Sequence, residues 1–293
     1  GSARAGIFDQ TGKCLGVGKK DILIFQDGGH IVEQSGDDIW ASVCVAVQTA
    51  LRESNVDTSK IGGVGFDATC SLVVVKDDGS PLPIGDSENA GRNIIVWMDH
   101  RATDQARRIN ATGHDVLRYV GGQISPEMET PKLLWLKESK PDVYKAADHF
   151  FDLTDYLTWR ATGDTARSIC TVTCKWTYLA HESKWDSSYF EQIGLGDLVA
   201  DEFRRIGQNI VEPGTSLGSG LAQQAAQDFG LPEGIPVAAG LIDAHAGGVG
   251  TIGAADNGGK PENRMGYVFG TSACTMSSTV EPAFVPGVWG PYY

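Results

Sequence analysis

The sequence has no long apolar run and no segment rich in lysine and arginine. A helix that spans a membrane needs roughly 18 or more consecutive apolar residues, and a secretory leader joins a basic region to an apolar one. Acidic residues outnumber basic ones by 37 to 24, which gives a formal net charge of -13. An acidic chain without a basic segment attracts neither a phosphate backbone nor an anionic membrane. We therefore expect no nucleic-acid partner and no membrane partner.

The six cysteines include no Cys-x-x-Cys pair and are scattered along the chain. Zinc sites and the disulfide frameworks of small secreted domains have closely spaced cysteines, so this distribution favours free thiols. Free thiols are typical of the cytoplasm, where we expect the protein to act. The 293 residues, of which 41% are hydrophobic, can bury a full core and predict one large domain or two.

The stretch from Ile235 to Gly253 carries the clearest functional signal. Its first part, Pro236 to Ile242, is short, apolar and bounded by turn residues, which predicts a buried strand. The strand stops at Asp243, and a glycine-rich segment typical of a tightly approached helix follows. Ligands collect at the carboxyl ends of strands in open α/β sheets, and free N–H groups at a helix start favour phosphate. Asp243 is therefore expected at a ligand site; the alternative is that it only caps the helix.

Two known glycine motifs do not fit this region. Gly248-Val-Gly-Thr-Ile-Gly253 spells the dinucleotide fingerprint, but it begins five residues after the strand and lacks the acidic residue about twenty positions later. Gly259-Lys260 resembles the end of a phosphate loop, but Ala254 replaces its first glycine and Pro261 its Ser/Thr. We therefore exclude a nicotinamide-dependent oxidoreductase and a phosphate-loop nucleotide site.

Hydrophobic periodicity along the rest of the chain predicts an α/β protein. Strands are predicted over 5–9, 14–26, 61–66, 72–76, 94–98 and 265–269. Helices are predicted over 36–54, 99–119, 131–138, 150–163, 197–206 and 221–229. Residues 168–178 are interpreted as a loop rich in Ser, Thr and Cys that carries a single lysine, Lys175.

Six short motifs, in register over essentially the whole chain, resemble the FGGY family of carbohydrate kinases. They are Gly1-Ser-Ala-Arg-Ala-Gly-Ile-Phe-Asp9, Phe66-Asp-Ala-Thr-Cys70, Val96-Trp-Met-Asp-His-Arg101, Pro131-Lys-Leu-Leu-Trp135, Gly240-Leu-Ile-Asp-Ala-His-Ala-Gly247 and Gly270-Thr-Ser272. Each motif alone is weak, but six in order are specific. Within the family, the details resemble the pentulose kinases of the ribulokinase type, and particularly the D-ribulose kinases.

The resemblance implies an actin-like, ribonuclease H-like ATPase fold with two domains around a cleft. It implies an N-terminal sugar-binding domain over residues 1–253, and a linker with the beginning of the C-terminal ATP-binding domain over residues 254–293. Of the family's opening motif Asp-x-Gly-Thr-x-Ser-x-Arg, only Gly1-Ser-Ala-Arg4 is present. We therefore expect a chain that is truncated at both ends, lacks its first strand and is inactive by itself.

The same resemblance implies phosphorylation of a pentulose by ATP with Mg²⁺, foremost D-ribulose to D-ribulose 5-phosphate. Such a transfer needs a base that receives the hydroxyl proton, and Asp243 matches the family's base. The positions that match sugar-binding residues are Asp67, Ala68, Thr69, Lys175 and Asp243. The positions that match residues around the phosphates of ATP are Arg4, Gly270, Thr271 and Ser272. No residue is assigned to a metal, and the partners are the sugar and ATP, with a homodimer left open.

Several alternatives stay open at this point. Lys175 could be a solvated surface lysine, and residues 67–69 could serve as a helix N-cap. His245 points elsewhere on a helix than Asp243 and is interpreted as a structural residue. Trp97, Asp99 and Arg101 fit core and ion-pair roles as well as a pocket. The alternative functions are a kinase for L-ribulose, xylulose or glycerol, and a sugar-binding member of the same fold without catalysis.

Overall fold

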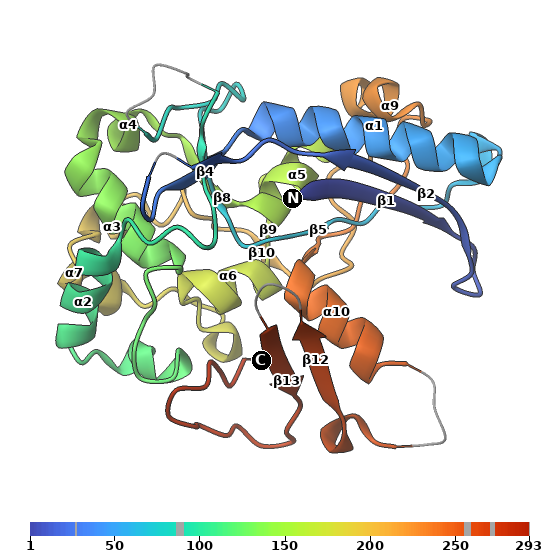
Figure 1. The fold of residues 1–293 in the computed structure, drawn as a ribbon. Helices are drawn as coiled ribbons and strands as arrows, with labels where there is room; N and C mark the ends of the chain where they lie inside the picture. Colours follow the sequence, from blue (N-terminus) through green and yellow to red (C-terminus); the bar gives the residue numbers. More distant parts are fainter. Residues whose placement is uncertain (27, 86–90, 255–258, 270–272, 293) are drawn as a thin grey trace.

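The computed structural model describes residues 1–26, 28–85, 91–254, 259–269 and 273–292, and it confirms the α/β class (Figure 1). A five-stranded sheet of order β3-β4-β7-β6-β8 lies at the centre, and all neighbouring strands in it are antiparallel. The strands are β3 (Phe25–Gln26), β4 (Val32–Gln34), β7 (Ile94–Ile95), β6 (Leu72–Val75) and β8 (His149–Asp152).

Strand β6 is apolar at every position because helices cover both faces of the sheet. Leu72 and Val74 point into one buried cluster, whereas Val73 and Val75 point into another, as the two-residue period of a strand requires. The first cluster contains residues of α2 (Thr103–Ala111), α3 (Glu129–Ser139), α4 (Pro141–Ala146), α6 (Ile169–Trp176), α7 (Ser187–Gln192) and α8 (Gly196–Ala200). The second contains residues of α1 (Gly36–Ser54), α5 (Leu153–Thr162) and α9 (Gln223–Phe229). Figure 1 shows α1 beside α9, away from the group of α2, α3 and α7.

Helix α1 has the bounds that the sequence predicts because its signals are local. Ser35 caps its start and accepts a hydrogen bond from the backbone N–H of Asp38, and Asn55 ends it in the left-handed conformation. The antiparallel pair β1 (Ser2–Phe8) and β2 (Cys14–Asp21) packs along this helix. A Cβ atom at Gly18 would lie 1.9 Å from the backbone oxygen of Ala46, so only glycine allows this close approach.

Two predictions of secondary structure are wrong in the middle of the chain. Residues 150–163 are not one helix, because β8 occupies 149–152 and α5 begins at Leu153, where Asp152 caps it. Residues 168–178 are not a loop, because Ser168 caps helix α6 over Ile169–Trp176. In both places the apolar or β-branched residues are buried against the sheet, and this packing decides their conformation.

Other predicted elements are present with different bounds. Helix α3 begins at Glu129, so Pro131 is its third residue and not its first. The helix predicted over 99–119 divides into α2 and a 3₁₀ helix over Asp115–Tyr119. The strands predicted over 61–66 and 236–242 form one isolated bridge between Val64 and Val237 and then the short parallel pair β5 (Asp67–Ala68) and β11 (Leu241–Ile242).

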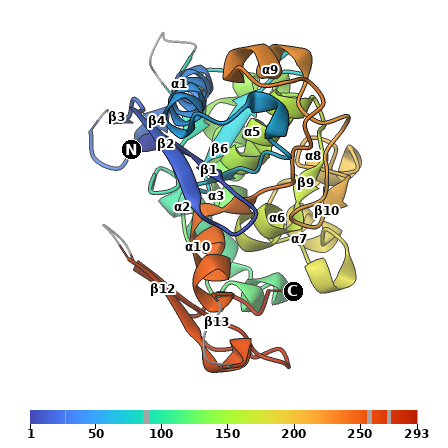
Figure 2. The same ribbon diagram turned by 90° about the vertical axis from the view of Figure 1, so that its right-hand side faces the viewer.

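Helix α10 (Asp243–Ile252) follows β11 and packs against the antiparallel pair β12 (Met265–Phe269) and β13 (Ala273–Ser277), as Figures 1 and 2 show. A Cβ atom at Gly248 would lie 2.7 Å from the methyl carbon of Met276, so a strand makes the close approach that this glycine permits. The remaining elements are the parallel pair β9 (Arg167–Ser168) and β10 (Ile210–Val211), and 3₁₀ helices over Thr58–Lys60, Ala180–Glu182 and Pro261–Asn263. In the described part of the chain, no helix has the length and apolar character needed to cross a bilayer.

Candidate active site

The parallel pair β5–β11 brings two carboxylates together. Leu241 pairs with Asp67 and Ile242 with Ala68, so Asp243 follows the end of one strand beside the neighbouring strand that carries Asp67. Desolvation raises the pKa of Asp67 and the nearby Asp243 carboxylate raises it further, although the residue stays exposed. The expected position of Asp243, at the carboxyl end of a strand, is confirmed.

Asp243 is the first residue of α10 and not its cap. Ile242 occupies the N-cap position and no side chain caps this helix, so the capping alternative is wrong. The Oδ1 atom of Asp243 accepts a hydrogen bond of 2.7 Å from the backbone N–H of Ala244, and the residue is exposed. An exposed carboxylate at a helix start can accept a proton from a bound hydroxyl group.

Residues 67–69 do not cap a helix either, because β6 is the next element of the chain. Ala68 and Thr69 are partly buried, and the Oγ1 atom of Thr69 lies 3.4 Å from the Oγ atom of Ser71. The main chain of this segment therefore runs beside Asp243 at the strand ends, as expected for a ligand-lining segment.

Lys175 lies in α6 and is only 6% exposed, so the surface alternative is wrong. Among the described residues, its Nζ atom donates no hydrogen bond and forms no ion pair; the ring centroid of Trp289 lies 4.4 Å from it. Desolvation acts against its charge, but Cys70, Cys174 and Glu129 outweigh that effect and raise the pKa of Lys175. The ammonium group therefore stays charged with donors that a ligand can use.

Two buried carboxyl groups near Lys175 were missed by sequence reasoning. Burial raises the pKa of Glu129 to about 7, with Lys132 and Lys175 acting in the opposite direction. Burial and the neighbouring Asp155 raise the pKa of Asp152 well above its usual range. The side-chain atoms Glu129 Oε2 and Asp152 Oδ2 have no hydrogen-bond partner within the described part of the protein. The available signal was an acidic residue between apolar neighbours, such as Asp152 between Phe151 and Leu153.

His245 faces α6 and not the Asp243 carboxylate. Its Nδ1 atom lies 3.1 Å from the Sγ atom of Cys170, and its ring centroid lies 6.2 Å from that of Tyr292. Desolvation and the charge of Lys175 lower its pKa. This agrees with the structural interpretation of His245. All six cysteines are free thiols.

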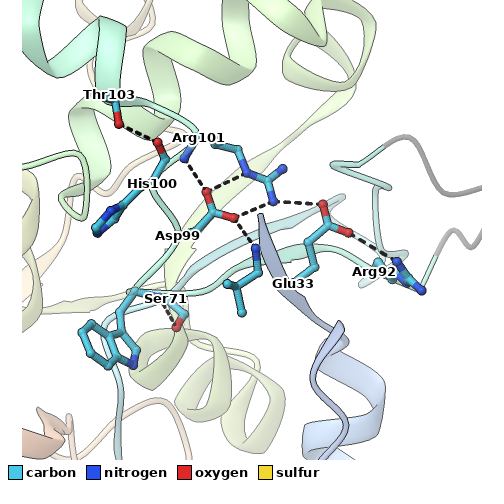
Figure 3. A network of polar contacts seen from close by, with 9 residues as sticks. Glu33, Ser71, Arg92, Asp99, His100, Arg101 and Thr103 are labelled. Carbon is cyan, nitrogen blue, oxygen red and sulfur yellow. Dashed lines mark hydrogen bonds and ion pairs between the residues drawn. The ribbon is translucent and has the colours of Figure 1, made fainter. Parts of the chain in front are cut away.

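Asp99 and Arg101 belong to a buried ion-pair network, which Figure 3 shows. Arg101 donates to both carboxylate oxygens of Asp99 and to Glu33 in β4, at 2.8 to 2.9 Å. Asp99 also accepts a hydrogen bond from the backbone N–H of Val32. These residues tie the segment after β7 to β4, and their structural interpretation is confirmed.

The assignment of residues to the phosphates of ATP stays a prediction. Arg4 is exposed in β1, where it pairs with Lys19 of β2. Gly270, Thr271 and Ser272 lie outside the described residues. Nor does the described part contain a group of three or more His, Cys, Asp or Glu residues that could hold a metal ion.

Residues 1–250 match the family described as "FGGY family of carbohydrate kinases, N-terminal domain". The chain is 50% identical over 301 residues to a human FGGY carbohydrate kinase domain-containing protein, covering 100% of this chain and 54% of that protein. It is 40% identical over 324 residues to a D-ribulokinase of Saccharomyces cerevisiae, covering 100% of this chain and 45% of that protein. The chain thus spans about half the length of the curated relatives that it matches.

Solved structures of sugar kinases share the fold. The gluconate kinase of Lactobacillus acidophilus superposes with a TM-score of 0.80 at 18% identity, over 98% of this chain and 54% of that chain. The xylulose kinase of Rhodospirillum rubrum superposes with a TM-score of 0.77 at 18% identity, over 98% of this chain and 57% of that chain. The actin-like fold expected from the sequence is confirmed.

Proposed function

Because the chain belongs to the FGGY family of carbohydrate kinases, we propose that it forms the sugar-binding part of a kinase that transfers the terminal phosphate of ATP to a pentulose. The foremost substrate is D-ribulose and the product is D-ribulose 5-phosphate. In this proposal residues 1–253 hold the sugar, and residues 254–293 begin an ATP-binding domain. We further propose that the chain is part of a longer, full-length protein similar in size to its relatives, of which it spans about half.

One observation carries the proposal: two exposed carboxylates lie near each other, that of Asp67 in one of two neighbouring parallel strands and that of Asp243 directly after the other. A phosphoryl transfer to a hydroxyl group requires a positioned base and groups that orient the sugar, with little covalent chemistry by the protein. The two carboxylates supply acceptors for sugar hydroxyl groups, and Lys175 supplies a charged donor.

Each residue then has a separate role. Asp243 accepts the proton of the attacking sugar hydroxyl group. At the same time the oxygen of that hydroxyl group bonds to the terminal phosphorus of ATP, and the bond from this phosphorus to the departing ADP breaks. Asp67 and the backbone of Ala68 and Thr69 hold other hydroxyl groups of the sugar. Lys175 donates to its carbonyl or hydroxyl oxygens. Arg4, Gly270, Thr271 and Ser272 remain the residues proposed for the phosphates of ATP.

ATP enters with Mg²⁺, which spreads the charge of the transferring phosphate. Magnesium commonly binds one or two protein carboxylates and takes its other ligands from phosphate oxygens and water. Asp67 and Asp243 would supply two such carboxylates. Asp243, however, is the proposed base and must keep a free oxygen for the proton. We therefore assign no residue of this chain to the metal.

D-Ribulose is proposed ahead of other sugars because the yeast relative named a D-ribulokinase matches the whole chain. L-Ribulose, xylulose and glycerol are the alternative substrates. A non-catalytic sugar-binding protein would have no need of the exposed carboxylate at Asp243.

The experiment that tests the function measures ADP release by the full-length protein with ATP and Mg²⁺. D-Ribulose, L-ribulose, D-xylulose, glycerol and gluconate are supplied separately, and the phosphorylated product is identified by mass. We expect the highest kcat/KM with D-ribulose, and no measurable turnover by the 293-residue chain alone. Sugar-independent ADP release would contradict the proposed kinase, and a higher kcat/KM with another sugar would replace the proposed substrate.

A further inference from the structure

The C-terminal segment over residues 284–292 returns to the proposed sugar-binding part and is held there by contacts along its length. Gly287 and Gly290 donate backbone hydrogen bonds of 2.9 and 2.8 Å to the carbonyl oxygens of Gly121 and Tyr119. The guanidinium carbon of Arg118 lies 3.8 Å from the ring centroid of Phe284. Figure 1 shows this dark-red segment below α6. The segment is therefore attached to the end of the 3₁₀ helix Asp115–Tyr119 and to Gly121 after it.

The end of this segment reaches the helices that carry the proposed site. The hydroxyl group of Tyr292 donates a hydrogen bond of 3.3 Å to the backbone oxygen of Cys174 in α6. The ring of Tyr292 also lies beside that of His245, two residues after Asp243 in α10. Tyr292 thus contacts the residue before Lys175 and the first turn of the helix that begins at Asp243.

Trp289 lies between Gly287 and Gly290 in this segment, and its ring covers the proposed sugar-binding lysine. Its ring centroid is 4.4 Å from Lys175 Nζ, a distance typical of a cation on an aromatic face. Within the described residues this ammonium donates no hydrogen bond, although the lysine is almost completely buried. Trp289 is itself 36% exposed, so part of its indole remains open to a ligand.

We propose that Trp289 is a further substrate-contacting residue that determines the sugar specificity of the site. Its ring restricts the Lys175 ammonium to one side and offers an aromatic surface to the C–H groups of the sugar chain. The face of an aromatic ring carries partial negative charge and attracts the positively polarised hydrogens of such groups. Small-molecule sites commonly combine an aromatic wall with a few placed polar groups, here Lys175, Asp67 and Asp243. This inference rests on the proposed function.

The test compares three variants of the full-length protein with D-ribulose and ATP as substrates. Trp289→Leu removes the ring, Trp289→Phe keeps a smaller ring, and Phe284→Leu is the matched control. Phe284 lies in the same segment, also contacts a cation and is 39% exposed, but its partner is Arg118 and not Lys175.

We expect Trp289→Leu to raise the KM for D-ribulose about tenfold, because it removes both an aromatic wall and a cation–π contact. The KM for ATP should change less than about twofold, since ATP does not touch this ring. Trp289→Phe should keep the KM for D-ribulose close to that of the wild type, because a ring remains. Phe284→Leu should leave the KM values for D-ribulose and ATP near those of the wild type.

Equal sugar KM values for Trp289→Leu and Phe284→Leu overturn the inference, because the ring would then act only through docking of the segment. An equal rise of the sugar and ATP KM values in Trp289→Leu overturns it as well. Absence of sugar-dependent turnover in the wild type contradicts the proposed function itself, and the role of Trp289 falls with it. If the wild type turns over D-ribulose and Trp289→Leu leaves the KM for D-ribulose unchanged, the role of Trp289 is rejected and the proposed function is not.

Discussion

The Sγ atom of Cys170 in α6 lies 3.1 Å from the Nδ1 atom of His245 in α10. Burial raises the pKa of Cys170 to about 12, while desolvation and Lys175 lower the pKa of His245. Both groups are therefore uncharged, and the hydrogen bond joins a neutral thiol to a neutral imidazole. This hydrogen bond ties the helix that carries Lys175 to the helix that begins at Asp243.

Loss of this tie is expected to lower turnover in the full-length protein. Cys170→Ala should reduce kcat about fivefold, the effect of one neutral hydrogen bond of about 1 kcal/mol on the placement of the proposed base. Cys170→Ser should stay closer to the wild type because a hydroxyl group can still form a hydrogen bond with Nδ1. The control is Cys44→Ala, a half-buried cysteine in α1. Equal effects of Cys44→Ala and Cys170→Ala on kcat would show that the hydrogen bond is irrelevant to turnover.

Asp243→Asn should lower kcat by about 10² or more and leave the sugar KM nearly unchanged, because an amide keeps the hydrogen-bonding shape but cannot accept the proton. Steady-state kinetics with D-ribulose measure both constants. Asp67→Asn is the matched comparison, since Asp67 lies in the neighbouring strand. We expect that variant to raise the sugar KM more than it lowers kcat. Near-wild-type turnover of Asp243→Asn would remove Asp243 from the role of base.

Lys175→Met should raise the KM for D-ribulose strongly and the KM for ATP little, because the lysine is proposed to touch only the sugar. The methionine side chain preserves most of the buried volume, so the fold should be retained. Lys137→Met is the control, since Lys137 lies in α3, is partly exposed and forms an ion pair with Asp197. A rise of the two KM values by the same factor in Lys175→Met would contradict a specific sugar contact.

Glu129 should make the protein less stable as the pH rises from about 4.5 to about 7. Its pKa is raised from 4.5 to about 7, so the folded state binds more protons than the unfolded state in that window. Glu129→Gln cannot titrate. The unfolding free energy of the wild type minus that of Glu129→Gln should therefore fall with rising pH, by at most about 3 kcal/mol. Urea unfolding of the full-length proteins at several pH values measures this difference.

Glu138→Gln, in the same helix, gives the control for that experiment. Desolvation acts to raise the pKa of Glu138, but hydrogen bonds from Arg108 and Gln105 outweigh it and lower the pKa. The corresponding difference between the wild type and Glu138→Gln should therefore fall as the pH drops below about 4.5, which is the opposite sign. A difference for Glu129→Gln that does not vary between pH 4.5 and 7 would refute the raised pKa of Glu129.

Sequence reasoning succeeded where the deciding interactions are local. Helix α1 follows from Ser35, the acidic first turn and the apolar spacing, all of which act within a few residues. The position of Asp243 between a strand and a helix could be found because an apolar strand, a carboxylate and small residues are consecutive in the chain. The family could be recognised because its motifs are short and keep their order.

Sequence reasoning failed where burial overrides local preference. Phe150 and Phe151 fit a helix or a strand, and pairing with β6 makes them a strand. The Thr- and Cys-rich segment after Ser168 becomes α6 because Val172 and Trp176 pack into the core. In both cases the intrinsic free energies of the helical and extended conformations differ by less than the free energy gained from apolar burial.

By itself, the sequence determined the α/β class, the family and the proposed base. Only the tertiary structure decided that Lys175 is buried, that Glu129 and Asp152 share its surroundings, and that Trp289 covers it. These groups come from distant segments, and their charge states depend on desolvation and on neighbours that folding brings together. No pattern of adjacent residues encodes such a contact, because the free energy that fixes it comes from packing the whole chain around the sheet.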